Sequence, residues 1–143
     1  MGISYILVLG VIVHVACQVY KVVYYSIRDK KFSPHMLLSA GGMPSTHSAF
    51  TTTIALSLGL TYGFASEYFT IAFTFTAIVI YDSLRLRGAV QTLAEVVAGM
   101  ADKKTRDRIP LRVGHTFAEI VIGIGFAIVV SVAGYLVRPA LGV

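Results

Sequence analysis

Charged residues are scarce in this chain. They make up 13% of its 143 residues, whereas hydrophobic residues make up 56%. An ordinary soluble domain carries about 25% charged residues. The apolar residues also form continuous blocks rather than alternating patterns. A single integral membrane domain over residues 1–143 is therefore the first interpretation.

Cysteine is almost absent as well. Cys17 stands alone inside an apolar block, which excludes a disulfide framework and a cysteine-based metal site. We expect it to be a small buried hydrophobic residue. The basic residues lie in two loops with no interleaved aromatic platform on which bases could stack. The net charge of +5 therefore indicates membrane topology rather than nucleic-acid binding.

Four apolar blocks predict an all-α, polytopic membrane bundle with about four transmembrane helices. They run over Ile3–Tyr25, His47–Tyr62, Tyr68–Tyr81 and Thr116–Val137. The first block has neither the basic start nor the small-residue end of a signal peptide, so we expect a retained helix. A tight turn at 63–67 makes the second and third blocks an antiparallel hairpin. Farther along, residues 89–100 are apolar on one face, which predicts an amphipathic helix at the membrane interface or over the bundle.

Lysine and arginine predict the orientation. They gather in loops 28–41 and 84–112, whereas the 63–67 turn has none. By the positive-inside rule both basic loops are cytoplasmic and both termini lie outside the cell membrane. Four short spans are also compatible with a homodimer in which a second copy closes a pocket.

Polar residues converge on the cytoplasmic face of this topology. His47 begins the second span, Asp82 ends the third, and His115 begins the fourth. Lys21 lies within the last two turns of the first span, toward the same face. This convergence predicts a functional site.

The histidine of the fourth span has an acidic neighbour. Glu119 follows His115 by four residues, within reach of the imidazole on one helix face. A carboxylate on one ring nitrogen fixes the tautomer and leaves the other nitrogen more basic, as a nucleophile or general base requires. The pair is also compatible with a purely structural contact, but an ionisable glutamate inside a membrane span favours function.

The stretch GGMPSTHSAF, residues 41–50, opens the second span. Pro44 suits the first turn of a helix, and the glycines, Gly42 among them, admit backbone conformations closed to other residues. Free N–H groups at a helix start, with the hydroxyls of Ser45 and Thr46, predict an anion site. Taken alone, the stretch favours an ordinary cap and turn.

Cations are available to such an anion site. Lys21 and Arg28 are seven positions apart, so both share one helix face. Arg85 and Arg87 are either further phosphate ligands or plain positive-inside residues. Asp82 is interpreted as a salt-bridge partner of one arginine or as a metal contact.

Four stretches in order make the chain similar to a known family: QVYKVVYYSIRDKKF, GGMPSTHSAF, YDSLRLRGAVQ and GHTFAEIVIG. The chain resembles the divergent branch of the type 2 phosphatidic acid phosphatase superfamily, membrane relatives of acid phosphatases and vanadium haloperoxidases. The match covers most of the chain.

The resemblance has departures as well as matches. Where the first family motif ends in Arg-Pro, Asp29 replaces the proline, and Thr46 stands at the glycine of Pro-Ser-Gly-His. In the third motif, His115 matches and Glu119 replaces an aspartate, but Ile109 occupies the arginine position.

The resemblance implies phosphoester hydrolysis without a metal or other cofactor. His115 would attack phosphorus and form a phosphohistidine, oriented by Glu119, and His47 would protonate the leaving alcohol. The groups implied to hold the phosphate oxygens are Lys21, Arg28, Ser45 and the N–H groups of residues 42–46. The implied substrate is a lipid phosphate or diphosphate, prenyl or glycerolipid, with its head group at the cytoplasmic face and its tail between helices.

Other interpretations stay open at this point. The first is a non-catalytic membrane protein that retains a phosphate-binding site. The second is a metal-dependent phosphatase that uses Asp82, Glu119 and the histidines. An intramembrane protease built on Ser45 and His115 does not explain the gathered basic residues, and no pair of broken helices indicates a transporter.

Overall fold

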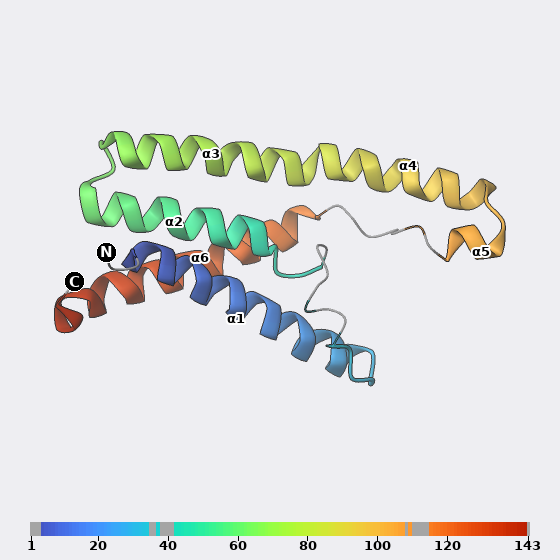
Figure 1. The fold of residues 1–143 in the computed structure, drawn as a ribbon, viewed down its shortest axis with the longest axis horizontal. Helices are drawn as coiled ribbons and strands as arrows, with labels where there is room; N and C mark the ends of the chain where they lie inside the picture. Colours follow the sequence, from blue (N-terminus) through green and yellow to red (C-terminus); the bar gives the residue numbers. More distant parts are fainter. Residues whose placement is uncertain (1–3, 35–36, 38–41, 108, 110–114, 143) are drawn as a thin grey trace.

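The fold is known from a computed structural model that describes residues 4–34, 37, 42–107, 109 and 115–142. Throughout these residues the structure is helical, without strands. In chain order the elements are α1 (Tyr5–Arg28), α2 (Thr46–Tyr62), α3 (Glu67–Leu84), α4 (Leu86–Met100), α5 (Lys103–Arg106), α6 (Phe117–Val137) and η2 (Arg138–Leu141) (Figure 1). The all-α prediction is therefore confirmed for the described part of the chain.

Three stretches of helix are long and apolar enough to cross a membrane. They are Tyr5–Arg28, Glu67–Met100 and Phe117–Leu141. The predicted second span forms α2, but this helix has 17 residues and is shorter than the three candidates. A membrane helix needs roughly 17–25 residues, so the crossing of α2, and with it the four-span topology, stays a prediction.

Helix α2 lies at the centre of the bundle, where it packs against α1, α3 and α6. The described side chains that it buries are all small: Thr46, Ser48, Ala49, Thr51, Thr53, Ala55, Ser57 and Gly59. Small residues let helix backbones approach closely, which is how helices associate in a membrane where no hydrophobic effect drives them together. The composition of α2 therefore explains its central place.

Hydroxyl groups join α2 to its neighbours. The Thr76 hydroxyl of α3 lies 3.0 Å from the Thr51 carbonyl oxygen and 2.8 Å from the Ala72 carbonyl oxygen of its own helix. The Ser131 hydroxyl of α6 donates to the Thr53 carbonyl at 3.3 Å. These contacts fix the register of α2 against α3 and α6.

Helix α4 continues α3 almost in line, with Arg85 as the single residue between them (Figure 1). The amphipathic helix predicted near 89–100 therefore exists but begins earlier, at Leu86. It runs past the end of the bundle instead of covering it. The reason is that no glycine or proline interrupts residues 67–87, so the α3 helix has nothing to end it where the apolar block ends.

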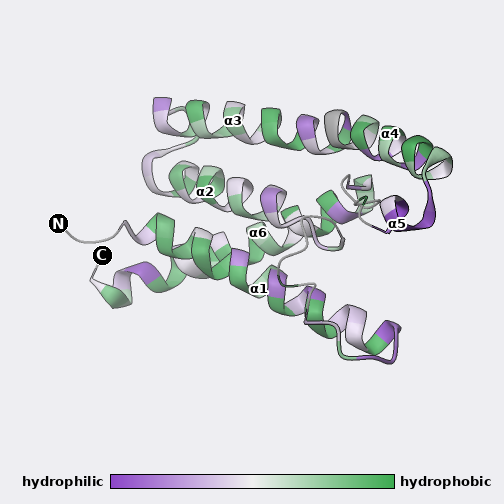
Figure 2. Ribbon diagram, turned by 45° about the vertical axis from the view of Figure 1, so that its right-hand side comes forward, coloured by the Kyte–Doolittle hydropathy of each residue, from purple (hydrophilic) through white to green (hydrophobic). Residues whose placement is uncertain are grey.

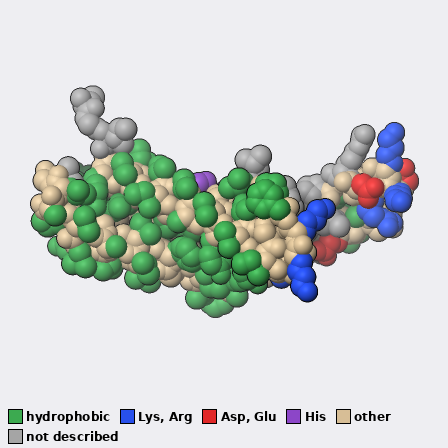
Figure 3. Space-filling model, turned by 90° about the horizontal axis from the view of Figure 1, so that it is seen from below, with side chains coloured by type: hydrophobic (Ala, Val, Ile, Leu, Met, Phe, Trp, Pro, Cys, Tyr) green, Lys and Arg blue, Asp and Glu red, His purple; other side chains and the backbone are tan. Residues whose placement is uncertain are grey.

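Large apolar side chains cover the outside of the bundle, and charges gather at one end. Exposed examples are Val11, Ile71, Phe73 and Val129. In Figures 2 and 3 hydrophobic residues follow the bundle helices, while lysine, arginine, aspartate and glutamate cluster beyond them near α5. Such a contiguous apolar surface is suited to lipid rather than water.

The predicted role of Cys17 is confirmed. Its side chain is fully buried in a small apolar core with Val13 and Ala49, and Phe126 and Val130 pack against this core. Its thiol is free, and the chain has no other cysteine.

Replacing Thr76 with valine should destabilise the bundle. The substitution keeps the shape of the side chain and removes the hydroxyl that reaches the Thr51 carbonyl. We expect the free energy of unfolding in detergent to fall by about 0.6 kcal/mol, the mean for such bonds between membrane helices, and by no more than about 1.7 kcal/mol. Thr74→Val is the matched control, because the exposed Thr74 hydroxyl bonds only within α3, to the Thr70 carbonyl. Equal losses in the two variants would contradict the interhelical role.

Candidate functional site

The site is centred on the contact between His115 and Glu119. The Nδ1 atom of His115 lies 3.0 Å from Oε2 of Glu119, and both side chains are buried. The contact predicted from the spacing is therefore present, but its cause differs from the prediction. His115 precedes the helix, since Thr116 is the N-cap of α6. Its ring reaches the carboxylate because the Glu119 side chain turns back toward the N-cap, where it also bonds the Thr116 N–H.

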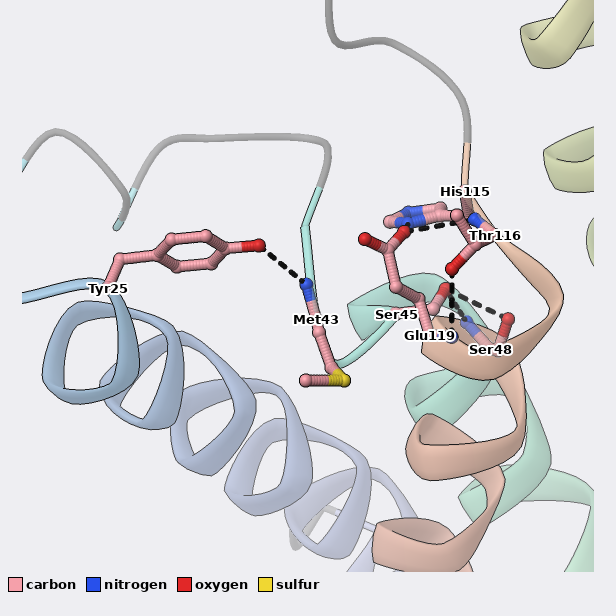
Figure 4. A network of polar contacts seen from close by, with 7 residues as sticks. All are labelled: Tyr25, Met43, Ser45, Ser48, His115, Thr116 and Glu119. Atoms are coloured by element: carbon pink, nitrogen blue, oxygen red, sulfur yellow. Dashed lines mark hydrogen bonds and ion pairs between the residues drawn. The ribbon is translucent and has the colours of Figure 1, made fainter. Parts of the chain in front are cut away.

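The cap is a reciprocal capping box. The Glu119 carboxylate accepts a hydrogen bond from the Thr116 backbone N–H at 3.1 Å, and the Glu119 N–H donates to the Thr116 hydroxyl at 3.3 Å. Two N–H groups at the start of α6 are satisfied in this way. Glu119 thus starts the helix and holds the imidazole with the same carboxylate oxygen (Figure 4).

The second nitrogen of the imidazole, Nε2, does not share the contact that Nδ1 makes with Glu119. Within the part of the chain that the structure describes, Nε2 of His115 is buried and has no hydrogen-bond partner. When the carboxylate accepts the Nδ1 proton, Nε2 carries the lone pair. A buried nitrogen with an available lone pair is suited to act as a nucleophile or as a ligand.

The stretch from Gly42 to His47 docks directly on α6. The Ser45 backbone N–H donates to the Glu119 carbonyl oxygen at 2.8 Å. One turn farther along α6, a Cβ atom added to Gly123 would lie 2.5 Å from the Ser45 carbonyl oxygen. Gly123 was not singled out from the sequence, although its spacing of four from Glu119 places both on the same helix face.

The predicted anion site has fewer open N–H donors than the sequence suggested. The Met43 N–H donates to the Tyr25 hydroxyl at 3.3 Å, and the Ser45 N–H is taken by Glu119, so both are engaged within the protein. Ser45 acts as the N-cap of α2 and its hydroxyl bonds that of Ser48 at 2.9 Å. Pro44 consequently precedes the cap instead of occupying the first turn. Thr46 is the first residue of α2 and is buried.

Gly42 has a positive φ of 92° and lies against Tyr25. A Cβ atom there would meet the Tyr25 hydroxyl at 2.9 Å. The expected need for glycine is thus confirmed at this position on two grounds, backbone conformation and space. Tyr25 itself is buried and was missed by the sequence reasoning, because a tyrosine in an apolar block carries no distinctive signal.

The two cations of the first motif are separated by the structure. Lys21 is fully buried inside α1, and its place in the site stays a prediction. Arg28 is exposed at the end of α1, where its Nε lies 2.6 Å from Asp29 Oδ1 and its guanidinium lies 4.4 Å from the Tyr25 ring centre. The acidic residue that replaces the family proline therefore holds Arg28, and the two cations do not converge in this structure.

The described charged residues at the junction of α3 and α4 differ in their exposure. Asp82 is half-buried in the last turn of α3, and Arg85 is exposed between α3 and α4. The side chain of Arg87 lies outside the described residues. His47 is exposed in the first turn of α2. Its predicted role as a proton donor stays a prediction.

A neighbouring residue, Ser83, contacts the site directly. Its carbonyl oxygen accepts a hydrogen bond from the His115 N–H at 3.4 Å, and its side chain is fully buried. Ser83 could not be found from the sequence, because a single serine beside charged residues carries no distinctive signal.

A cleft lies on the α4 side of the site. It has a volume of about 380 Å³ and lies between α4 and the start of α6, and its lining residues are Gly88, Gln91, Thr92, Glu95, His115, Thr116 and Glu119. Within α4, the Gln91 side chain donates a hydrogen bond to the Glu95 carboxylate at 3.1 Å, along the wall of the cleft.

Among the described residues, no three histidine, cysteine, aspartate or glutamate side chains lie close enough to hold a metal ion.

Replacing Gly123 with alanine should disturb the site. The new Cβ atom would meet a backbone oxygen that cannot rotate away, so the stretch around Ser45 must shift from α6. Overpacking of this kind costs about 1–3 kcal/mol, measured as the free energy of unfolding in detergent. Gly125→Ala is the control on the same helix, because a Cβ atom there meets nothing within 4 Å. The close contact is refuted if the two variants are equally stable.

Comparisons with known proteins agree with this architecture. The sequence profile described as "Divergent PAP2 family" matches residues 3–130. A curated relative, an uncharacterized membrane protein of Bacillus subtilis (strain 168) called YuiD, is 26% identical over 123 residues, covering 74% of this chain and 78% of the relative. No solved structure matches the chain significantly. On the extent of the profile match, the chain belongs to the Divergent PAP2 family and is a membrane protein.

Proposed function

We propose that the protein is a membrane phosphatase that hydrolyses lipid phosphates through a phosphohistidine on His115. The observation that carries the proposal is the state of the His115 ring. Nδ1 is held by Glu119, and Nε2 is buried with no partner among the described residues. Membership of the Divergent PAP2 family supports phosphate chemistry at this histidine.

In the first step, Nε2 of His115 attacks phosphorus and the bond to the leaving oxygen breaks. The Glu119 carboxylate stabilises the positive charge that develops on the ring. The leaving alcohol oxygen takes a proton, for which His47 is the proposed donor. Water then gives a proton to His47 and forms a bond to phosphorus, the P–N bond breaks and its electron pair returns to Nε2. Inorganic phosphate is released.

Positive charge must balance the phosphate oxygens in both steps. Lys21, which is buried within α1, is the first proposed cation. Arg28 reaches it only after it leaves Asp29, and Arg85 and Arg87 are the proposed contributors from the α3–α4 junction. The hydroxyls of Ser45 and Thr46 supply neutral donors.

The proposed substrate is a prenyl or glycerolipid phosphate, as a monoester or a diphosphate. Its support is the apolar surface of α1, α3 and α6, which suits contact with lipid. The basic residues support a cytoplasmic site, because Lys103, Lys104 and Arg106 lie together in α5, within the loop between the third and fourth predicted spans.

One observation favours a second function, a non-catalytic protein that binds phosphate. The side chains of Lys21, Ser45 and His115 are fully buried, and the N–H groups of Met43 and Ser45 are already engaged. A site with so few open donors is compatible with a retained binding pocket. Turnover separates the two functions.

The purified protein should release phosphate from at least one member of a panel of lipid phosphates, in the presence of EDTA. Replacing His115 with alanine should reduce the rate to background, since the nucleophile is lost. Glu119→Gln should lower the rate by at least about 100-fold, because an amide cannot stabilise the imidazolium.

His14→Ala is the matched control, since His14 is an exposed histidine within α1, away from the site. It should keep the wild-type rate. If wild type and His115→Ala were equally inert across the panel, the binding function would replace the catalytic one. Loss of activity in EDTA alone would favour a metal-dependent enzyme.

The proposed orientation has its own test. A reporter fused after Val143 should be external, and residues 101–109 should be protected from external protease in sealed cells, because the basic loops stay in the cytoplasm. The opposite pattern would move the site to the outer face and change the pool of lipid phosphates that it meets.

A further inference from the structure

Three buried polar atoms near the site have no hydrogen-bond partner within the described residues: the hydroxyl oxygens of Thr46 and Ser83, and Nε2 of His115. The exposed fractions of the three residues are 3%, 0% and 7%. A buried polar group without a partner is costly and rare in folded proteins. Three of them in one place therefore need an explanation.

The three atoms come from separate segments that meet at one end of the bundle. The Ser83 carbonyl oxygen bonds the His115 N–H at 3.4 Å, so these two residues are neighbours. The contact between Thr76 and Thr51 fixes the antiparallel register of α3 and α2. Thr46 lies about 7 Å along α2 from Thr51, and Ser83 lies about 10 Å along α3 from Thr76. Because the two helices are antiparallel, both displacements point toward the same end of the bundle.

Other buried atoms lack a partner too, namely those of Gln18, Thr52 and Thr53. They lie inside α1 and α2 rather than at a helix start or beside His115. What distinguishes Thr46 and Ser83 is their link to the segment that carries His115. The Ser83 carbonyl bonds the His115 N–H, and Thr46 follows Ser45, whose N–H bonds the Glu119 carbonyl. The segments that meet at His115 therefore carry two buried hydroxyls and one imidazole nitrogen without a partner among the described residues.

We propose that Ser83 is an anion-binding residue whose hydroxyl, together with that of Thr46, donates hydrogen bonds to the oxygens of a phosphate group facing His115 Nε2. The inference rests on the proposed function, because it takes the ligand to be a phosphate. Hydroxyl donors cannot be deprotonated at neutral pH and add no charge, so they suit an oxyanion next to a buried lysine. They also replace the backbone donors that Met43 and Ser45 have committed elsewhere.

The test uses the full-length protein in detergent and inorganic phosphate as the probe. The dissociation constant for phosphate is obtained from the rise in unfolding temperature with phosphate concentration. Ser83→Ala and Thr46→Val, which remove only the hydroxyls, should each weaken phosphate binding by about tenfold or more, the range for a hydrogen bond to a charged group. Thr46→Ser keeps the hydroxyl and should bind within about twofold of wild type.

The same melts without phosphate separate a ligand role from a structural one. Removing a buried hydroxyl that has no partner should leave the unfolding temperature of Ser83→Ala unchanged or higher. Ser131→Ala is the matched control, because the buried Ser131 hydroxyl is bonded to the Thr53 carbonyl. It should melt lower and bind phosphate as wild type does.

Each outcome decides the matter. The inference is overturned if Ser83→Ala binds phosphate like wild type, or if it loses as much stability as Ser131→Ala without phosphate. A wild-type protein that binds no phosphate overturns both this inference and the proposed function. A wild-type protein that binds phosphate with the expected losses, yet hydrolyses no lipid phosphate, supports the anion site and overturns only the phosphatase.

Discussion

The architecture of the site depends on one glutamate. Oε2 of Glu119 accepts the Thr116 N–H and contacts His115 Nδ1, and its carbonyl oxygen accepts the Ser45 N–H. Its charge also interacts with Lys21. A single residue therefore starts α6, orients the histidine, anchors the start of α2 and balances the buried lysine.

Glu119 has so many partners because a charge is costly in an apolar environment. A carboxylate removed from water is tolerated only when opposite charge and hydrogen bonds surround it. Glu119 obtains both from separate parts of the chain, so each partner constrains the others. The arrangement also explains why the histidine contact alone does not prove catalysis. The same bonds would be needed if Glu119 served only to cap α6, and the discriminating feature is the second ring nitrogen of His115.

The sequence predicted what depends on local pattern. Apolar blocks located the bundle helices to within a few residues, the spacing of His115 and Glu119 predicted their contact, and Cys17 was placed in the core. It did not predict what depends on the path of the chain in space. Seven positions put Lys21 and Arg28 on one helix face, but only the structure shows that α1 carries Arg28 to a helix end where Asp29 holds it.

Tertiary packing accounts for the other differences. Whether the N–H groups before α2 are available depends on what packs beside them, and Tyr25 and Glu119 come from helices far away in the sequence. Ser83 joins the site because α3 continues past the apolar block, a length that composition does not mark. The periodicity of a sequence predicts which residues share a face of one helix. It does not predict which faces of different helices come together, and the site lies where they do.

The start of α2 lies deep against α6. The Ser45 carbonyl lies against Gly123, which is six residues inside α6, or about 9 Å along its axis. Helix α2 therefore begins below the level at which α6 begins. Lys21, seven residues before the end of α1, and the side chain of His115 are both fully buried. These two groups lie inside the bundle rather than at its rim, where a snorkelling lysine would be expected.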